Sequence, residues 1–384
     1  MAPLSIAELQ EIKKLARDFA QKELLPVVAR HEESETFAME VYRKLTQTKL
    51  HVLNLPETFG GADSLYALTL VAEELGRVDP GFVLSVMASS QLFGYNVLRL
   101  GTAEQKERYL KALADENKIG AWALTEPDTG SDAVGIKTRA VKEGDSYRLT
   151  GSKTFITNAP IADYFIILAR ESGEGIEGGT AFLLERGHPG MEVSTPLKKM
   201  GHRTSPTGQI FFQDCKVPAR QVLGRPGKAF FDMKHSLDLE RLGFMGIGMG
   251  MMKECLERAA HYSLTRKQFG RPIAEFQLVQ EHLAKMAAQV ELLETYLENG
   301  FRRHAEGKSI HYEAAILKAI GADMCLDVTN RAVQILGGNG YMREYVVERL
   351  MRDARLFPIG GGTTEINLLI IAREVLKRHA ATAR

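Results

Sequence analysis

The spacing of the apolar residues changes twice along this chain of 384 residues. From Ser5 to about Ala114 apolar residues recur at helical spacing. Between about Ile119 and Leu223 the pattern changes to short β-rich runs, such as Tyr164–Leu168, separated by Gly, Pro and Asp. After Gly224 the helical spacing returns. This order does not alternate as βαβ units do, so the sequence predicts an α+β multidomain protein and disfavours a doubly wound parallel sheet.

The two changes of pattern place the expected domain boundaries. We expect an all-α domain over 1–118, a β-domain over 119–226 and a helical domain over 227–384. The last domain contains four long helical segments separated by turn-like Gly and Pro residues, and the sequence therefore predicts a four-helix bundle, with helices near 228–262, 275–306, 309–336 and 363–379.

Composition excludes several classes of partner. Lys and Arg number 49 against 48 Asp and Glu, so the chain lacks the basic excess that binds nucleic acid or an anionic membrane surface. The longest apolar run, Leu242–Met252, is too short to cross a bilayer, and we expect no integral membrane contact. The three cysteines are far apart and form no CxxC pair, which favours a reducing compartment and no metal site.

The N-terminus begins with a helix-capping pattern, Ser5-Ile6-Ala7-Glu8. It continues directly into an amphipathic stretch, without a basic or apolar leader. We therefore expect a cytoplasmic protein, from a bacterium.

One glycine motif invites a dinucleotide-binding interpretation. Gly173–Gly178 satisfies GxGxxG and follows a strand-like run. The fingerprint requires a helix next, because the helix N-terminus binds the pyrophosphate, but here a second strand-like run, Thr180–Leu184, follows. We interpret the segment as a hairpin loop and expect any dinucleotide to be held elsewhere.

Three other segments carry a family likeness: Ala123–Asp132 (ALTEPDTGSD), Arg266–Gly270 (RKQFG) with Phe276-Gln277, and Gln334–Tyr341 (QILGGNGY). On these segments the chain resembles the acyl-CoA dehydrogenases over essentially its whole length, departing at Thr129, where the family usually has a smaller residue. The resemblance implies FAD as the cofactor and no metal. It also implies an acyl-CoA substrate, an electron-transfer flavoprotein as electron acceptor, and a homotetramer built as a dimer of dimers.

The resemblance also implies a set of FAD-binding residues. Thr125 and Thr157 would lie at the isoalloxazine ring, Phe155 stands where the family commonly has Trp, and Ser131 would lie near the flavin phosphates or the CoA chain. A neighbouring subunit would supply residues to the adenylate half of the FAD. The full set is Trp122, Leu124, Thr125, Gly130, Ser131, Phe155, Thr157, Arg266, Phe269, Gln277, Gln334, Gly337, Gly338, Thr363 and Glu365. Without the resemblance, these residues indicate only turns, strand ends and a helix stop.

Abstraction of a proton next to a thioester requires a carboxylate with a pKa near neutral. Many members of the family carry this base in a Tyr-Glu-Gly-Thr segment, which here is Gly360–Thr363 and contains no carboxylate. The isovaleryl-CoA and long-chain types carry the base on the first helix of the bundle, where Glu240 matches. The residues three and four positions from Glu240 are uncharged, so no helical ion pair holds its pKa down. A surface helix residue remains the simpler alternative.

The substrate site follows from the same resemblance. The backbone N–H of Gly361 would polarise the thioester carbonyl, and the missing side chain would widen the pocket for a methyl-branched chain or a long straight one. Asp238 and Arg241 would contact the CoA moiety, although their spacing also suits a helix-surface ion pair. Candidates for the acyl pocket are Leu92, Phe93, Tyr95 and Phe244, and each is equally compatible with a core position.

Two alternatives differ in function. An acyl-CoA oxidase-like or nitroalkane-oxidase-like flavoprotein would pass electrons to oxygen, but this chain is shorter than typical acyl-CoA oxidases. A non-catalytic acyl-CoA- or FAD-binding protein would have lost its base, and Glu240 argues against that. Reduction of bound FAD by an acyl-CoA distinguishes an enzyme from a binding protein.

Overall fold

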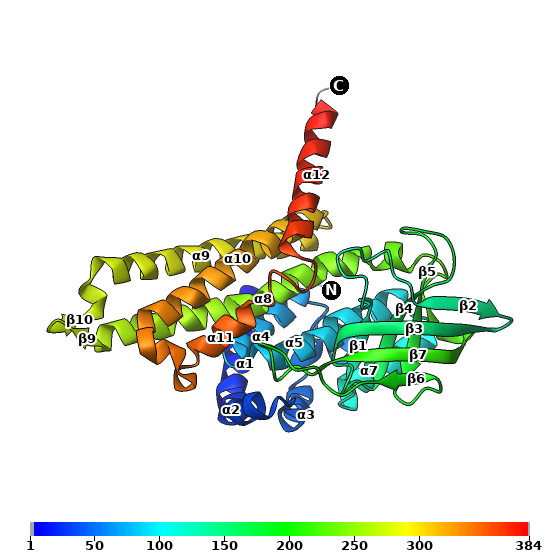
Figure 1. Cartoon of the computed structure of the whole chain (residues 1–384), viewed down its shortest axis with the longest axis horizontal. Coiled ribbons are helices and arrows are strands. Elements are labelled where there is room, and N and C mark those ends of the chain that lie inside the picture. Colours follow the sequence, from blue (N-terminus) through cyan, green and yellow to red (C-terminus); the bar gives the residue numbers. More distant parts are fainter. Residues whose placement is uncertain (1–3, 383–384) are drawn as a thin grey trace. The chain divides into compact units, whose positions relative to one another are not determined.

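The structure is a computed structural model that describes residues 4–382. The chain forms two compact units. The first comprises residues up to Val71, Phe82–Lys199 and Arg203–Leu237, and the second comprises Ala72–Gly81, Met200–His202 and the chain from Asp238 onward. Figure 1 shows the path of the chain through its elements.

Helices form the N-terminal third of the chain. The first begins at the capping box expected from the sequence: the Ser5 side chain accepts from the Glu8 N–H, and the Glu8 side chain accepts from the Ser5 N–H. Two π-helical turns, η1 (Ala20–Leu24) and η4 (Ala88–Gly94), interrupt the α-helical path. The α-helices are α1 (Ile6–Phe19), α2 (Leu25–Ser34), α3 (Met39–Thr48), α4 (Leu65–Gly76), α5 (Pro80–Met87), α6 (Tyr95–Leu100) and α7 (Ala103–Asp115).

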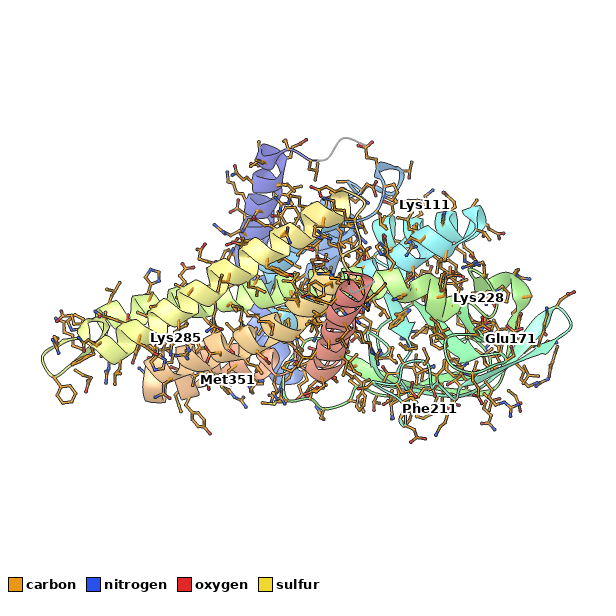
Figure 2. The ribbon with its side chains drawn as sticks, turned by 90° about the horizontal axis from the view of Figure 1, so that it is seen from above. Lys111, Glu171, Phe211, Lys228, Lys285 and Met351 are labelled. Atoms are coloured by element: carbon orange, nitrogen blue, oxygen red, sulfur yellow. The ribbon has the colours of Figure 1, made fainter. Side chains whose placement is uncertain are left out.

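A mostly antiparallel sheet follows, in the order β6-β7-β3-β2-β4-β5-β8, with β1 paired in parallel to β4. Strand residues alternate between its faces, so that on β7 Phe212 is buried while Phe211 is exposed (Figure 2). The strands are β1 (Gly120–Ala123), β2 (Arg139–Glu143), β3 (Ser146–Thr157), β4 (Tyr164–Arg170), β5 (Gly179–Glu185), β6 (Met191–Val193), β7 (Thr207–Pro218) and β8 (Val222–Leu223).

The glycine motif at 173–178 connects β4 to β5, which pair antiparallel. A strand and not a helix follows it, so the interpretation as a hairpin loop is confirmed and the motif cannot present a helix N-terminus to a pyrophosphate.

The helices and sheet of the first unit share one hydrophobic core. Phe93 of η4 packs in this cluster with Leu110 of α7 and with Ile166 and Leu183 of the sheet. The first-unit helices therefore depend on the sheet for burial of their apolar faces.

The stretch Pro80–Leu100 is long and apolar enough to cross a membrane by length and composition alone, and the sequence pattern did not single it out. Within the structure 78% of its most apolar window is buried. It runs through α5, η4 and α6, and its burial is that of a core helix.

Long helices dominate the second unit. They begin with α8 (Ala229–Thr265), followed by α9 (Gln277–Ala305), α10 (His311–Leu336), α11 (Val347–Ala354) and α12 (Thr364–Thr382), with a small hairpin of β9 (Lys267–Gln268) and β10 (Arg271–Pro272) between α8 and α9. The fold class expected from the sequence, helices then strands then a helical bundle, is confirmed.

Two glycines allow these helices to approach closely. A Cβ at Gly300 of α9 would stand 2.9 Å from Leu242 of α8, and a Cβ at Gly321 of α10 would stand 2.8 Å from Leu293 of α9. Beyond its first turns, α12 leaves the other helices of this unit (Figure 1). Its residue Leu376 is 70% exposed.

Candidate active site

Helix α8 presents Glu240 from a largely buried surface. Its neighbours Leu239 and Leu242 are fully buried, while Glu240 itself is partly exposed. Burial raises the pKa of Glu240 to about 7, although the positive charges of Arg241 and Lys318 act in the opposite direction. A carboxyl that is desolvated, reachable and poised near neutral has the properties of a general base.

Gly361 lies beside this carboxyl. Its φ of +66° is one that residues with a side chain rarely adopt. A Cβ built there would stand 3.5 Å from Lys318 Cε, 3.7 Å from Glu240 Oε1 and 3.9 Å from Phe244 Cδ1. The structure therefore brings together the two residues expected to be catalytic, Glu240 and Gly361, and one expected in the acyl pocket, Phe244.

Lys318 of α10 belongs to this centre, and the sequence interpretation missed it. It is fully buried, its Nζ donates to the carbonyl oxygen of Phe357, and it lies 5.6 Å from the centroid of the Phe244 ring. Phe244 in turn stacks on Phe357 at 4.3 Å between ring centroids. One signal was available: Lys318 is the only charged residue in the apolar run 314–322. A lysine in such a run must either reach solvent or find a partner.

Asp238 and Arg241 form a buried ion pair with 2.7 Å between Arg241 Nη1 and Asp238 Oδ1. His311 Nδ1 lies 2.9 Å from the same oxygen, an addition that sequence spacing could not reveal. Arg241 Nε has no hydrogen-bond partner, and Arg241 Nη2 lies 3.7 Å from the Cβ position of Gly362. The pair is therefore not a solvated surface pair, and it leaves a donor free next to the glycine turn.

The glycine turn runs directly into α12. Thr363 caps this helix, because its Oγ1 accepts from the N–H of Ile366 at 3.3 Å. Glu365 in the first helical turn is exposed. Both residues expected to bind FAD here lie at a helix N-terminus, where backbone N–H groups favour an anion.

The first unit holds the other main group of expected cofactor residues. The N–H of Thr154 donates to the Thr125 carbonyl at 2.9 Å, which places the loop after β1 beside the end of β3. Phe155 is 69% exposed and has a φ of +56°, unusual for an aromatic residue. Trp122 carries a buried indole N–H without a hydrogen-bond partner. Leu124, Thr125 and Thr157 are partly exposed nearby in sequence.

A buried ion pair supports this surface. Lys153 is fully buried and its Nζ donates to Glu126 Oε1 at 2.7 Å and to the Leu124 carbonyl at 2.9 Å. The Glu126 carboxylate also accepts from the backbone N–H groups of Lys137 and Thr138. Gly130 and Ser131 follow in an exposed turn of the same loop. Their partnership could not be read from the sequence, because 27 positions separate Glu126 from Lys153.

The remaining expected cofactor residues lie on the second unit. All are exposed: Arg266, Phe269, Gln277, Gln334, Gly337 and Gly338. Phe269, in the β9–β10 hairpin, is 93% exposed with a φ of +51°. Tyr262 ties the end of α8 to the short helix Gly337–Tyr341, since its hydroxyl accepts from Asn339 at 3.0 Å. Their full exposure in one chain is compatible with the expectation that they serve a neighbouring subunit.

The expected acyl-pocket residues of the first unit occupy different environments. Phe93 is fully buried and stacks with Tyr164 at 6.2 Å between centroids. Leu92 and Tyr95 are partly exposed, at the end of η4 and the start of α6. Their role at an acyl chain remains a prediction.

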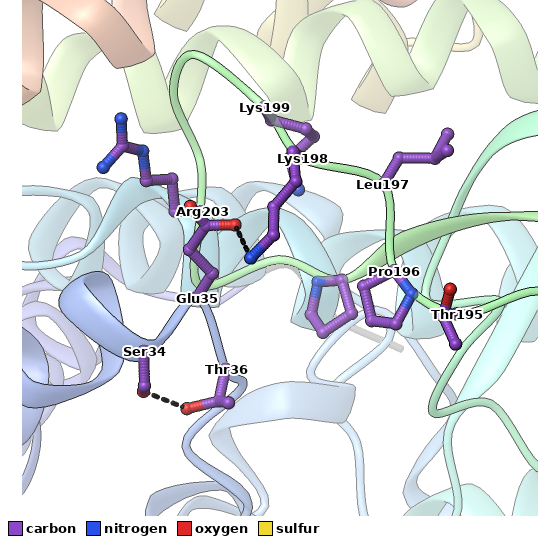
Figure 3. Close-up of a pocket in the computed structure, with 10 residues that line it drawn as sticks. Ser34, Glu35, Thr36, Thr195, Pro196, Leu197, Lys198, Lys199 and Arg203 are labelled. Atoms are coloured by element: carbon purple, nitrogen blue, oxygen red, sulfur yellow. Dashed lines mark hydrogen bonds and ion pairs between the residues drawn. The ribbon is translucent and has the colours of Figure 1, made fainter.

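A separate pocket of about 360 Å³ lies in the first unit between the turn after α2 and the loop at 195–206 (Figure 3). None of the expected site residues lines it. Among residues 4–382 no group of three His, Cys, Asp or Glu side chains is arranged to hold a metal ion.

The residues present fit a flavin. The unpartnered indole N–H of Trp122 and the exposed ring of Phe155 provide a donor and an apolar surface on the first unit. The fold, the near-neutral carboxyl of Glu240 and these residues together fit a flavin-dependent oxidoreductase.

The comparisons with known proteins give the family. The N-terminal, middle and C-terminal domains of acyl-CoA dehydrogenase match residues 7–117, 121–215 and 230–376. Mitochondrial isovaleryl-CoA dehydrogenase of Arabidopsis thaliana is 36% identical over 96% of this chain and 91% of its own length. The chain belongs to the acyl-CoA dehydrogenase family.

Solved structures agree. Butyryl-CoA dehydrogenase from Megasphaera elsdenii is 37% identical, with a TM-score of 0.93, 98% of this chain covered and 100% of the solved chain. A chain from a study of the electron-transferring flavoprotein of Acidaminococcus fermentans and electron bifurcation is 35% identical, with a TM-score of 0.94 and coverages of 98% and 99%. This protein is thus an FAD-dependent dehydrogenase of acyl-CoA thioesters.

Proposed function

We propose that Glu240 removes the α-proton of the acyl-CoA thioester while the backbone N–H of Gly361 donates to the thioester carbonyl. Bound FAD supplies the acceptor for the hydride that leaves Cβ. The observation that carries the proposal is the position of the Glu240 carboxylate, 3.7 Å from the Cβ position of a glycine whose N–H requires no particular side chain. The proton moves to Glu240 Oε, and the carbonyl donor stabilises the negative charge that develops on the thioester oxygen.

The test is the variant Glu240→Gln. We expect it to bind FAD and keep the flavin spectrum, and to be reduced by acyl-CoA roughly 10²–10⁴-fold more slowly, the usual contribution of a general base. Glu257→Gln is the matched control, because Glu257 lies on the same helix with a side chain that is 53% exposed. It should be reduced at the wild-type rate. Reduction of Glu240→Gln at the wild-type rate would overturn the assignment.

For the substrate we propose a methyl-branched acyl group. The nearest atoms to the Cβ position of Gly361 stand at 3.5 to 3.9 Å, ordinary van der Waals distances, so a methyl-sized group fits there. Isovaleryl-, isobutyryl-, butyryl-, octanoyl- and palmitoyl-CoA are titrated anaerobically while the flavin absorbance is followed. Faster bleaching by isovaleryl- or isobutyryl-CoA than by the straight chains supports the proposal, and faster bleaching by octanoyl- or palmitoyl-CoA contradicts it.

The CoA contacts remain part of the proposal. Arg241 holds a free Nε–H beside the glycine turn and keeps its orientation through Asp238, which supports a role of this pair at the CoA moiety. Leu92, Phe93, Tyr95 and Phe244 are proposed for the acyl pocket on the family resemblance.

The assembly is proposed to be a homotetramer, a dimer of dimers. Large apolar side chains are exposed on the second unit, and they include Phe269, Leu292, Leu369 and Leu376. Exposed apolar surface of this kind marks protein interfaces. Sedimentation equilibrium of the holoenzyme should give four copies, and a monomer at micromolar concentration would contradict the assembly.

Electron-transfer flavoprotein is the proposed acceptor. The structural relative from a study of such a flavoprotein supports this partner. Rapid reoxidation of the reduced enzyme by oxygen would favour the oxidase alternative instead.

We also propose a cytoplasmic location in a bacterium and domain limits at 118/119 and 226/227. Three buried free cysteines suit a reducing compartment, and the ranges of the family matches support the limits.

A further inference from the structure

We propose that Lys318 is a positioning residue of the reaction: its buried ammonium group keeps Glu240 in the carboxylate form that accepts the proton. This inference rests on the proposed role of Glu240. It assigns a function to a residue on α10, a helix that otherwise contributes no side chain to the expected catalytic centre.

The geometry places Lys318 and Glu240 on two sides of one small space. From the Cβ position of Gly361, Lys318 Cε is 3.5 Å away and Glu240 Oε1 is 3.7 Å away. No side chain at position 361 separates them. Lys318 Cε and Glu240 Oε1 therefore lie at most about 7 Å apart, and opposite charges at such a separation in desolvated surroundings interact more strongly than in water.

The other contacts of Lys318 leave its charge available to Glu240. Its Nζ donates to the Phe357 carbonyl and lies over the Phe244 ring, and both are uncharged partners. The charged groups that act on Lys318 are Glu240, Arg241 and Asp323, with Glu240 the strongest. A buried lysine without a salt-bridged carboxylate is costly, so a structural role alone would be served by an apolar residue.

Arg241 does not substitute for Lys318. It also lowers the pKa of Glu240. Its effect on that pKa is larger than the effect of Lys318, but its Nη1 is bound to Asp238 at 2.7 Å and its charge is therefore shared with that carboxylate. Removal of Lys318 therefore removes the one cation near Glu240 that carries no bound carboxylate among the described residues.

The experiment compares charge-removing and charge-retaining variants of the holoenzyme. The rate of flavin reduction should increase with pH, and in Lys318→Met and Lys318→Gln the midpoint of this increase should lie about one pH unit or more above that of wild type. The reason is that loss of a nearby opposite charge raises a carboxyl pKa by about that amount. Lys318→Gln retains an amide donor for the Phe357 carbonyl, and Lys318→Arg should restore the wild-type pH profile.

Lys253→Met is the matched control. Lys253 is a mostly buried lysine on α8, paired with Glu73 and Glu294. It lies thirteen residues from Glu240, or about 20 Å along the helix. We expect Lys253→Met to remove a buried cation and to leave the pH profile of flavin reduction unchanged.

A second readout does not depend on turnover. The infrared band of the protonated Glu240 acid, identified by its absence in Glu240→Gln, should disappear at a higher pH in both charge-removing variants than in wild type. An unchanged midpoint in both variants overturns the role of Lys318. Reduction of Glu240→Gln at the wild-type rate would overturn the proposed base itself, and the two failures are therefore distinguishable.

Discussion

Glu240→Gln should make the protein more stable at alkaline pH. Burial raises the pKa of Glu240 from 4.5 to about 7. Each unit corresponds to about 1.4 kcal/mol, so ionisation of this group in the folded protein costs about 3 kcal/mol. The neutral acid is the form favoured by folding. Its contribution to stability is present below the unfolded pKa of 4.5 and is lost as pH rises through about 7.

Glutamine cannot ionise, so the variant keeps at high pH the stability that the wild type loses when Glu240 ionises. The unfolding free energy of the variant minus that of wild type should grow by roughly 2–3 kcal/mol between about pH 5 and pH 8. The thermal midpoints of both proteins, followed by circular dichroism across this range, give the comparison. Glu257→Gln removes a carboxylate whose side chain is 53% exposed from the same helix and serves as the control. A constant difference between Glu240→Gln and wild type would refute the desolvation of the base.

Three other perturbations test the supporting structure. Lys153→Met leaves Glu126 buried without its cation and should lower the unfolding free energy by about 3–5 kcal/mol, measured by denaturant titration. Gly361→Ala should cost about 1 kcal/mol through its positive φ. It should also slow reduction by branched acyl-CoA more than by straight-chain acyl-CoA, and equal slowing would refute the steric argument. Phe155→Gly should weaken FAD retention about tenfold through loss of ring contact, measured by the fluorescence of released flavin; unchanged retention would remove Phe155 from the site.

Much of the fold could be predicted from the sequence, because the buried face of a helix or strand sets the spacing of its apolar residues. The change from helical to strand-like spacing near Ile119 coincides with the start of β1 at Gly120. Glu240 could be singled out because its segment resembles that of the isovaleryl-CoA and long-chain types, and the structure places it in a desolvated environment.

What the sequence could not show are partnerships between distant segments. Lys318 meets Glu240 only because α8 and α10 pack together, and His311 reaches Asp238 in the same way. Spacing rules describe neighbours on one helix and carry no information on such pairs. The two π-helical turns could not be predicted from the sequence either, because a single extra residue in a helix hardly changes the spacing of its apolar residues.

The proposed base and the glycine turn at 360–362 belong to different segments of the chain, and this has a consequence for engineering. The carboxylate resides on a long rigid helix, whereas the segment 360–362 contributes only backbone. Sequence changes in that turn can reshape the substrate cavity without removing the base, as long as position 361 keeps the positive φ that goes with its N–H donor. The scaffold is therefore suited to directed evolution of acyl specificity, with the turn as the segment to randomise and α8 as the segment to leave alone.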